Sequence, residues 1–235
     1  MQMELVLVFA YATGRIFVMP PDQPMYLLNQ GKGHQKAHGF VDFFPFEFIK
    51  KRMPVISMEE FMEREGITGH LFAANSSLPK YPPGNKTVFV ATERDERLKM
   101  WEYLRAVGAC PKWESMSQFL VIPSVPGKDS SDLTDPVTAR RQFLFAANRT
   151  AVYYDKYWQK QKLIHFISKP GDGYRLLEHF YTYIFFENEF MDRFFKRFVR
   201  DYVHYMDVIF CKAALIINQL MKESGGKYNA FHIRR

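Results

Sequence analysis

The sequence predicts an α/β domain with a Rossmann-like, mostly parallel sheet and helices on both faces. Short apolar runs alternate along the chain with longer segments of helical periodicity. Most of these runs are apolar at every position, as expected for strands buried on both faces. Hydrophobic residues make up 47% of the 235 positions, which is enough for a sizeable core. We therefore expect residues 1–235 to form a single domain.

The helix and strand signals follow one another in order. Residues 1–14 are apolar on nearly every side, and Gly14 can close this helix in the left-handed conformation. Ser57 is expected to cap a helix with Glu60 three residues on, and Asp207 to cap the last helix. The expected helices are residues 1–14, 43–52, 58–66, 93–108, 173–205 (broken near 187–189) and 208–223. The expected strands are residues 16–21, 54–57, 86–92, 117–123, 151–155, 162–168 and 228–233.

Two stretches have the composition of loops. Residues 29–40 are polar and rich in glycine, and residues 123–136 cluster Pro, Gly, Ser and Asp. We expect residues 123–136 to be a loop inserted in the domain or a lid over a site.

The net charge suggests an anionic ligand without identifying it, and the cysteines argue against a disulfide-rich fold. The net charge of +7 suits an anionic ligand, such as a phosphate, a nucleic acid or an acidic membrane. The two cysteines are too few for a disulfide scaffold, and Cys211, within an apolar run, is expected to be a buried free thiol.

Three N-glycosylation sequons favour a compartment of the secretory pathway. They begin at Asn75, Asn85 and Asn148, among only seven asparagines. No run of apolar residues is long enough to span a membrane. Residues 1–10 lack a basic leader and a cleavage site, so they do not form a signal peptide.

Other polar patterns are weaker candidates for a site. His34 and His38 lie four residues apart, but the flanking glycines argue against a helix and no carboxylate or cysteine is adjacent, so we expect no metal site. The basic and aromatic stretch at residues 193–205 could bind nucleic acid. Its aromatic residues recur at helical spacing with basic residues between them, which favours a core face opposite a solvated face. The expected core residues are Phe194, Phe195, Phe198 and Tyr202.

The C-terminal stretch YNAFHIRR delivers three basic side chains to the end of an expected strand. Ligands of open parallel sheets bind beyond the carboxyl ends of the strands, where His232, Arg234 and Arg235 would lie. An arginine there could grip a phosphate through two hydrogen bonds and neutralise a departing diphosphate. The two arginines could equally solvate the end of a strand.

This stretch resembles the H-x-R-R element of the GDP-fucose O-fucosyltransferase family. Residues 5–21 resemble the first helix and second strand of that family, residues 39–49 and 54–62 its next block, and residues 192–210 the helices before the motif. The matches keep their order over most of the chain. The resemblance implies the N-terminal Rossmann-like half of a GT-B glycosyltransferase.

The resemblance also implies what lies beyond both ends. Family members carry a glycine- and asparagine-rich loop after their first strand and a second, donor-binding domain after the motif, and neither is found in residues 1–235. We therefore expect a fragment with an internal Met1, with any membrane anchor further upstream. We expect it to be inactive and prone to aggregation alone, and to be rescued by about 15 upstream residues that supply the strand and loop.

Site roles are implied by the same resemblance. Arg234 would contact the β-phosphate of GDP-fucose and help fucose to depart, and His232 would orient the strand end or the acceptor. A histidine hydrogen-bonded at a strand end is the alternative for His232. Arg235 matches an arginine found in only part of the broader group. The reaction would be inverting transfer to a hydroxyl, of protein Ser or Thr, without a metal or other cofactor, in the endoplasmic reticulum or Golgi lumen.

Three alternatives remain open at this point. A glycan fucosyltransferase would share the fold and the donor. A noncatalytic module that binds protein or carbohydrate would share the fold alone. A basic nucleic-acid-binding domain is the third, and it requires a continuous positive stripe; we expect no nucleic-acid partner.

Overall fold

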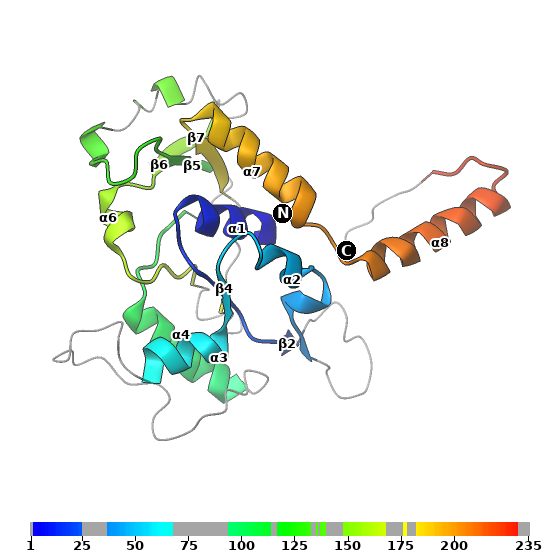
Figure 1. The fold of residues 1–235 in the computed structure, drawn as a ribbon, viewed down its shortest axis with the longest axis horizontal. Helices are drawn as coiled ribbons and strands as arrows, with labels where there is room; N and C mark the ends of the chain where they lie inside the picture. The colour runs from blue at the N-terminus through cyan, green and yellow to red at the C-terminus, as the bar shows by residue number, and fades with distance from the viewer. Residues whose placement is uncertain are drawn as a thin grey trace.

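The described residues form an α/β fold of helices and short strands (Figure 1). In two of their three sheets the paired strands are parallel. The computed structural model describes residues 2–24, 37–67, 94–113, 117–132, 135, 137–139, 148–167, 176–177 and 182–229. Its helices and parallel strand pairs confirm the mixed α/β, Rossmann-like class predicted from the sequence.

The first helix and the first strand form a compact unit. Helix α1 (Gln2–Ala12) is apolar around its circumference because it lies inside the domain, where Leu7 is fully buried. Gly14 ends the helix with a φ of 68°, as predicted, and Arg15 N–H donates to the Ala10 carbonyl over 2.8 Å. Strand β1 (Phe17–Met19) follows and pairs in parallel with β4 (Val55–Ser57).

Short elements connect β1 to β4 and continue beyond it. Strands β2 (Gln23–Pro24) and β3 (Ala37–His38) form a small antiparallel ladder, followed by a 3₁₀ turn (Phe40–Asp42) and α2 (Phe46–Ile49). The predicted cap of α3 (Met58–Phe61) is confirmed, since Ser57 Oγ accepts from Glu60 N–H over 3.1 Å. A π-helical turn (Met62–Ile67) extends α3.

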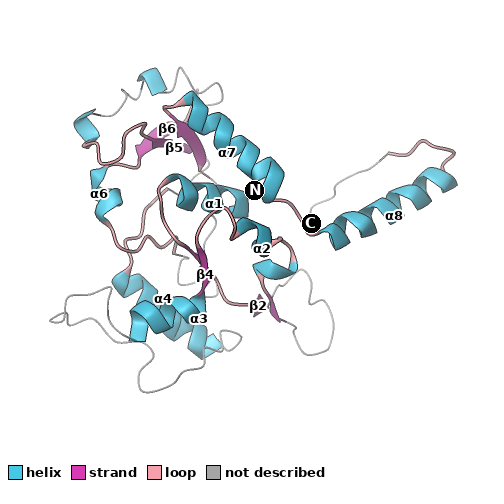
Figure 2. Ribbon diagram, in the orientation of Figure 1, coloured by secondary structure: helices cyan, strands magenta, loops and turns pink. Residues whose placement is uncertain are grey.

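The second parallel sheet has three strands in the order β6–β5–β7, and Figure 2 shows β5 and β6 in magenta near helix α7. Strand β5 (Gln118–Ile122) lies between β6 (Thr150–Tyr153) and β7 (Tyr183–Phe186). Leu120 of β5 contributes to the cluster that holds α1 and α7 residues, whereas Phe119 and Val121 pack with Ala139 on the other side. Both faces of β5 are therefore buried, which explains its all-apolar sequence.

Helices α4 and α7 supply the remaining core faces. Helix α4 (Arg94–Val107) packs with α3 in a separate cluster that includes Met100 and Leu104. Helix α7 (Glu189–Tyr202) is capped by Asn188, and Phe195 stacks on Phe186 of β7 with ring centroids 5.0 Å apart. The prediction of an aromatic core face is right for Phe195 and Phe198, whereas Phe194 is 48% exposed. The short α6 (Lys156–Lys160) begins after β6.

The last helix, α8 (Asp207–Glu223), projects from the body of the molecule (Figure 1). Every described side chain from Phe210 to Glu223 is exposed, so the prediction that Cys211 is a buried thiol is wrong. The N-cap is Met206 rather than Asp207, which lies in the first turn. In the first turn, the negative carboxylate of Asp207 lies near the positive end of the helix dipole, and this interaction stabilises the helix.

Three other predicted boundaries differ from the structure. Residues 183–186 were expected within a helix but form β7, because a short apolar run does not by its pattern distinguish strand from buried helix. Residues 162–167 form no regular strand and make only an isolated bridge, Ile164 to Ala109. The helix expected at residues 43–52 covers only Phe46–Ile49. The strand predicted at residues 86–92, and all but the first two residues of the one at 228–233, lie outside the described residues.

Candidate functional site

The three site residues predicted from the sequence lie outside the described residues. The structure describes the chain as far as Asn229, and His232, Arg234 and Arg235 follow that position. Helix α8 leads toward them through a turn in which Gly225 and Gly226 have φ values of 63° and 89°. The roles of the three residues therefore stay predictions.

A buried carboxylate lies at the carboxyl edge of the three-stranded sheet, the edge where parallel sheets bind ligands. Glu187 directly follows β7 and its side chain is only 7% exposed. Its Oε2 accepts from the backbone N–H of Ser124 over 2.9 Å and lies 3.5 Å from Nζ of Lys128. The Ser124 hydroxyl also donates to this oxygen over 3.4 Å, and the three donors together offset the cost of burying the carboxylate.

Further contacts tie the segment after β5 to the segment after β6. The backbone N–H of Lys156 donates to the carbonyl of Lys128 over 2.8 Å, and the Lys156 ammonium lies 3.4 Å from Oδ2 of Asp129. Together with Glu187, these contacts link the described part of the predicted loop or lid to the ends of β6 and β7. A lid here would have to break them to open.

Tyr153, the last residue of β6, shares this electrostatic environment. Burial raises the pKa of its phenol, and the negative charges of Asp135 and Glu187 raise it further. Tyr153 therefore stays protonated at neutral pH and can donate a hydrogen bond at this edge of the sheet.

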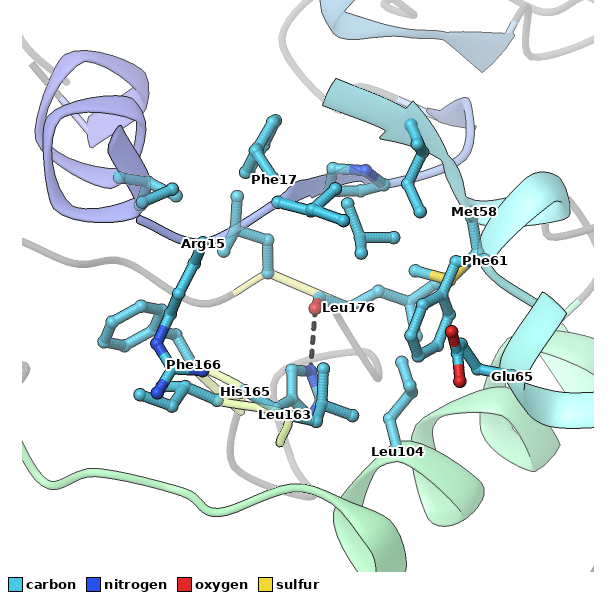
Figure 3. A pocket seen from close by; sticks show the side chains of 18 of the residues that line it. Arg15, Phe17, Met58, Phe61, Glu65, Leu104, Leu163, His165, Phe166 and Leu176 are labelled. Atoms are coloured by element: carbon cyan, nitrogen blue, oxygen red, sulfur yellow. Dashed lines mark hydrogen bonds between the residues drawn. The ribbon is translucent and has the colours of Figure 1, made fainter. Parts of the chain in front are cut away.

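A cavity of about 470 Å³ lies between α1, β1, α3, α4 and residues 162–166 (Figure 3). Its walls are mostly apolar, with charged side chains among the lining residues. The apolar wall includes Phe9, Phe17, Met58, Phe61, Leu104 and Leu163. The charged lining residues are Arg15, Arg64, Glu65 and Lys162.

His165 lines this cavity and is the only histidine buried among the described residues. Its Nε2 lies 2.8 Å from the Leu176 carbonyl oxygen, so Nε2 carries the proton and donates (Figure 3). Nδ1 is then a buried acceptor, and the described residues offer it no hydrogen-bond partner. Burial lowers the pKa of His165 to about 4, against the opposing effect of the Leu176 and Leu104 carbonyls. The imidazole is neutral at physiological pH.

The backbone holds His165 at the end of α4. The Ala109 carbonyl accepts from the His165 N–H over 3.0 Å, and the Ala109 N–H donates to Leu163 over 2.9 Å. A Cβ at Gly108 would lie 3.0 Å from Cβ of His165, so only glycine allows this approach without displacement.

Arg15 lines one side of the cavity, and its guanidinium is hydrogen-bonded to other groups of the protein. Its guanidinium donates to the Gln161 carbonyl over 2.8 Å, to the Trp158 carbonyl over 2.6 Å and to Tyr154 Oη over 3.0 Å. These bonds fasten the α1–β1 turn to residues 158–161. Arg15 is therefore structural rather than a ligand group.

No metal site can be identified in the part of the chain that the structure describes. No group of three or more His, Cys, Asp or Glu side chains there could hold an ion. His38 Nδ1 lies 3.3 Å from Asp42 Oδ2, a pair that is too small for a metal site, and His34 lies outside the described residues. None of the described helices is both long and apolar enough to cross a membrane.

Neither Glu187 nor His165 is among the functional residues predicted from the sequence. Glu187 was noted only as a break in a helical region, although a charged residue directly after an apolar run marks the carboxyl end of a buried strand. His165 was placed in an apolar strand, and a histidine inside such a run was the available signal of a buried imidazole.

A comparison with protein-family models matches the chain over its whole length. The family described as GDP-fucose protein O-fucosyltransferase matches residues 1–235. No curated protein and no solved structure matches the chain. The family match agrees with the resemblance in the C-terminal H-x-R-R stretch, and family membership implies a GDP-fucose donor and an acceptor substrate. With its parallel α/β fold and this match, the chain belongs to the GDP-fucose protein O-fucosyltransferase family.

Proposed function

We propose that this protein takes part in the transfer of fucose, with inversion, from GDP-fucose to a hydroxyl group, and that the acceptor is a Ser or Thr of a protein. The observation that carries the proposal is the family match over residues 1–235. The parallel strand pairs support it, because such a sheet gathers the ends of its strands at one edge, where a nucleotide sugar can be bound.

Arg234 is the proposed donor-binding and catalytic residue. A guanidinium at the β-phosphate stabilises the charge that builds up as GDP leaves, and it does so more strongly in the transition state than in the bound substrate. His232 is proposed to orient the strand end or the acceptor, and Arg235 to contact the donor. We propose that no metal takes part, because a fixed cation at the diphosphate can supply the charge that a metal would supply.

The site is proposed to belong to the N-terminal half of a GT-B enzyme of the endoplasmic reticulum or Golgi lumen. The sequons in the sequence support a lumenal location. In a GT-B enzyme a second Rossmann-like domain provides further donor contacts, so the measurement below includes the longest natural polypeptide that contains these residues.

The test compares Arg234→Ala and Arg234→Lys with the unchanged protein, both as residues 1–235 and in the longest natural polypeptide that contains them. GDP and GDP-fucose binding are measured by calorimetry, and fucose transfer to protein and to glycan acceptors is measured in the same preparations. We expect Arg234→Ala to lower transfer by about a hundredfold or more, the usual loss on removal of a charge-stabilising group. We expect Arg234→Lys to recover only part of it, because lysine lacks the two-pronged geometry.

Arg197→Ala is the matched control. Arg197 is an exposed arginine on α7, so its removal changes the net charge by the same amount without touching the proposed site. Equal transfer by Arg234→Ala and Arg197→Ala would overturn the role of Arg234. Transfer to free glycans alone would instead favour the glycan fucosyltransferase, and GDP binding without any transfer would favour a noncatalytic module.

Nucleic-acid binding is a poorer candidate. The basic side chains of α7 are interspersed with acidic ones, and Lys196 pairs with Asp192 over 2.6 Å and Arg200 with Asp201 over 2.7 Å. Ion pairs of this kind interrupt the positive stripe that phosphate backbones require.

A further inference from the structure

The three sequons exceed what the composition predicts. The chain has ten Ser and eight Thr among 235 residues, so 18 of 235 positions, about one in 13, would complete a sequon two residues after an asparagine. Seven asparagines would then give about half a sequon by chance, against three observed. Asn75 and Asn85 lie outside the described residues, and Asn148 lies within them.

The local structure presents both reactive side chains of the Asn148 sequon to solvent. Asn148 is exposed in the turn that precedes β6, and Thr150, the first residue of β6, is also exposed. Arg149 between them turns the other way, with its guanidinium 3.8 Å from the centre of the Tyr183 ring on β7. The middle residue of the sequon is thus held against β7, whereas the residues on either side of it stay exposed.

The sequon also lies away from the proposed substrate edge. Strands β5, β6 and β7 are parallel, so their amino ends lie at one edge of the sheet and their carboxyl ends at the other. Asn148 precedes β6 and lies at the amino edge, whereas Glu187 follows β7 at the carboxyl edge. A bulky group on Asn148 therefore leaves the carboxyl edge open.

We propose that Asn148 carries an N-linked glycan. The co-reactant is a lipid-linked oligosaccharide diphosphate in the lumen of the secretory pathway. The side-chain nitrogen of Asn148 forms a bond to the first sugar carbon, the bond from that carbon to the diphosphate oxygen breaks, and the amide loses one proton. Thr150 supplies the hydroxyl that the transferring enzyme recognises. The proposal rests on the proposed lumenal location.

The test uses the full chain, secreted from eukaryotic cells behind a cleavable signal sequence. Asn75→Gln and Asn85→Gln are introduced together, so that Asn148 is the last remaining sequon. We expect one glycan per chain, removed by peptide-N-glycosidase and located at Asn148 by peptide mass mapping. The protein isolated from its own cells should carry the same modified peptide.

Two pairs of variants separate the sequon from other effects. Thr150→Ala abolishes the modification, and Thr150→Ser keeps it, because serine preserves the hydroxyl at an exposed position. Asn148→Gln abolishes it, whereas Asn218→Gln leaves it unchanged, since Asn218 is an exposed asparagine of α8 with Leu220 in the third position.

Glycosylation of Asn148 is measured separately from GDP binding and fucose transfer. Enzymatic removal of the glycan should leave the melting temperature and GDP binding unchanged, because Asn148 is exposed and precedes β6 at the amino edge of the sheet. An unmodified Asn148 in folded protein from its own cells would overturn the inference. GDP binding and fucose transfer, measured on the same samples, would decide the proposed function separately.

Discussion

The imidazole of His165 donates its Nε2 proton to the backbone carbonyl of Leu176 over 2.8 Å, inside the core. This bond fixes the neutral tautomer and links the end of α4 to the described residues 176–177. The same burial makes the proton affinity of His165 different in the folded and unfolded chains.

The first prediction concerns pH. The pKa of His165 is about 4 in the folded protein against an ordinary value of 6.5, so between these values the unfolded chain binds a proton that the folded chain does not. The free energy of unfolding should therefore fall as pH falls through this window. Between pH 7.5 and pH 5 we expect a loss of about 2 kcal/mol from this residue. Urea unfolding across this range measures it.

Two substitutions make this prediction specific. His165→Gln keeps a donor for the Leu176 carbonyl but does not titrate, so it should reduce the pH dependence by about the same amount. His204→Gln, near the start of α8, should keep the dependence due to His165. An unchanged slope in His165→Gln would contradict the assignment.

The second prediction concerns Arg15, which fastens the α1–β1 turn to residues 158–161. Arg15→Lys keeps the charge but loses the planar group that reaches four acceptors at once, so we expect the free energy of unfolding to drop by about 2–3 kcal/mol. Urea denaturation monitored by tryptophan fluorescence measures the change. Arg197→Lys on the surface of α7 is the control and should stay within about 0.5 kcal/mol of the unchanged protein.

The third prediction concerns the segment after β5. Glu187→Ala leaves the Ser124 N–H without its acceptor and removes the ion pair with Lys128, so cleavage by trypsin at Lys128 should become markedly faster. Glu187→Gln keeps an acceptor for the amide and should show an intermediate rate. Glu189→Ala removes an exposed carboxylate that pairs with Arg193 and should leave the rate unchanged. Equal rates in all four proteins would show that Glu187 does not hold this segment.

The fourth prediction concerns the apolar side of α8. Phe210, Ile216, Ile217, Leu220 and Met221 are each at least 39% exposed and recur at helical spacing. These five side chains form an exposed apolar surface on α8. This surface should bind a hydrophobic dye, and it should make the protein self-associate more as its concentration rises. Ile216→Lys with Leu220→Glu should suppress both effects without changing the net charge.

Dye fluorescence and size-exclusion chromatography at several concentrations provide the measurement. The matched control is Asn218→Lys with Gln219→Glu, which adds the same two charges on the polar side of the helix. If the control suppressed dye binding as strongly as the apolar pair of substitutions, the effect would be one of charge and not of the exposed apolar side.

The sequence predicted those elements whose signals are local. Gly14 at a positive φ, Ser57 as an N-cap and the apolar strand at β5 are each specified within a few residues, and all three are confirmed. The helix–strand choice at residues 183–186 depends on partners distant in sequence, since β7 exists because β5 lies beside it. The sequence alone does not show that pairing.

In the candidate site, too, the sequence predicts local features but not those that depend on distant contacts. The H-x-R-R motif was recognisable because its residues are contiguous, and the family match agrees with that recognition. The burial of Glu187 depends on a segment 63 residues earlier, and that of His165 on a carbonyl 11 residues later. Contacts formed by folding over such separations leave no periodic pattern in the sequence.

The central position of β5 has a consequence for the timescale on which the backbone opens. Phe119, Leu120 and Val121 are fully buried and paired with strands on both sides, whereas β1 and β4 form a ladder of only three residues each. Amide protons of β5 should therefore exchange with deuterium only when the whole domain unfolds, and those of β1 and β4 through smaller local openings. The backbone amide protons of the domain should exchange in at least two steps, and those of β5 should exchange last.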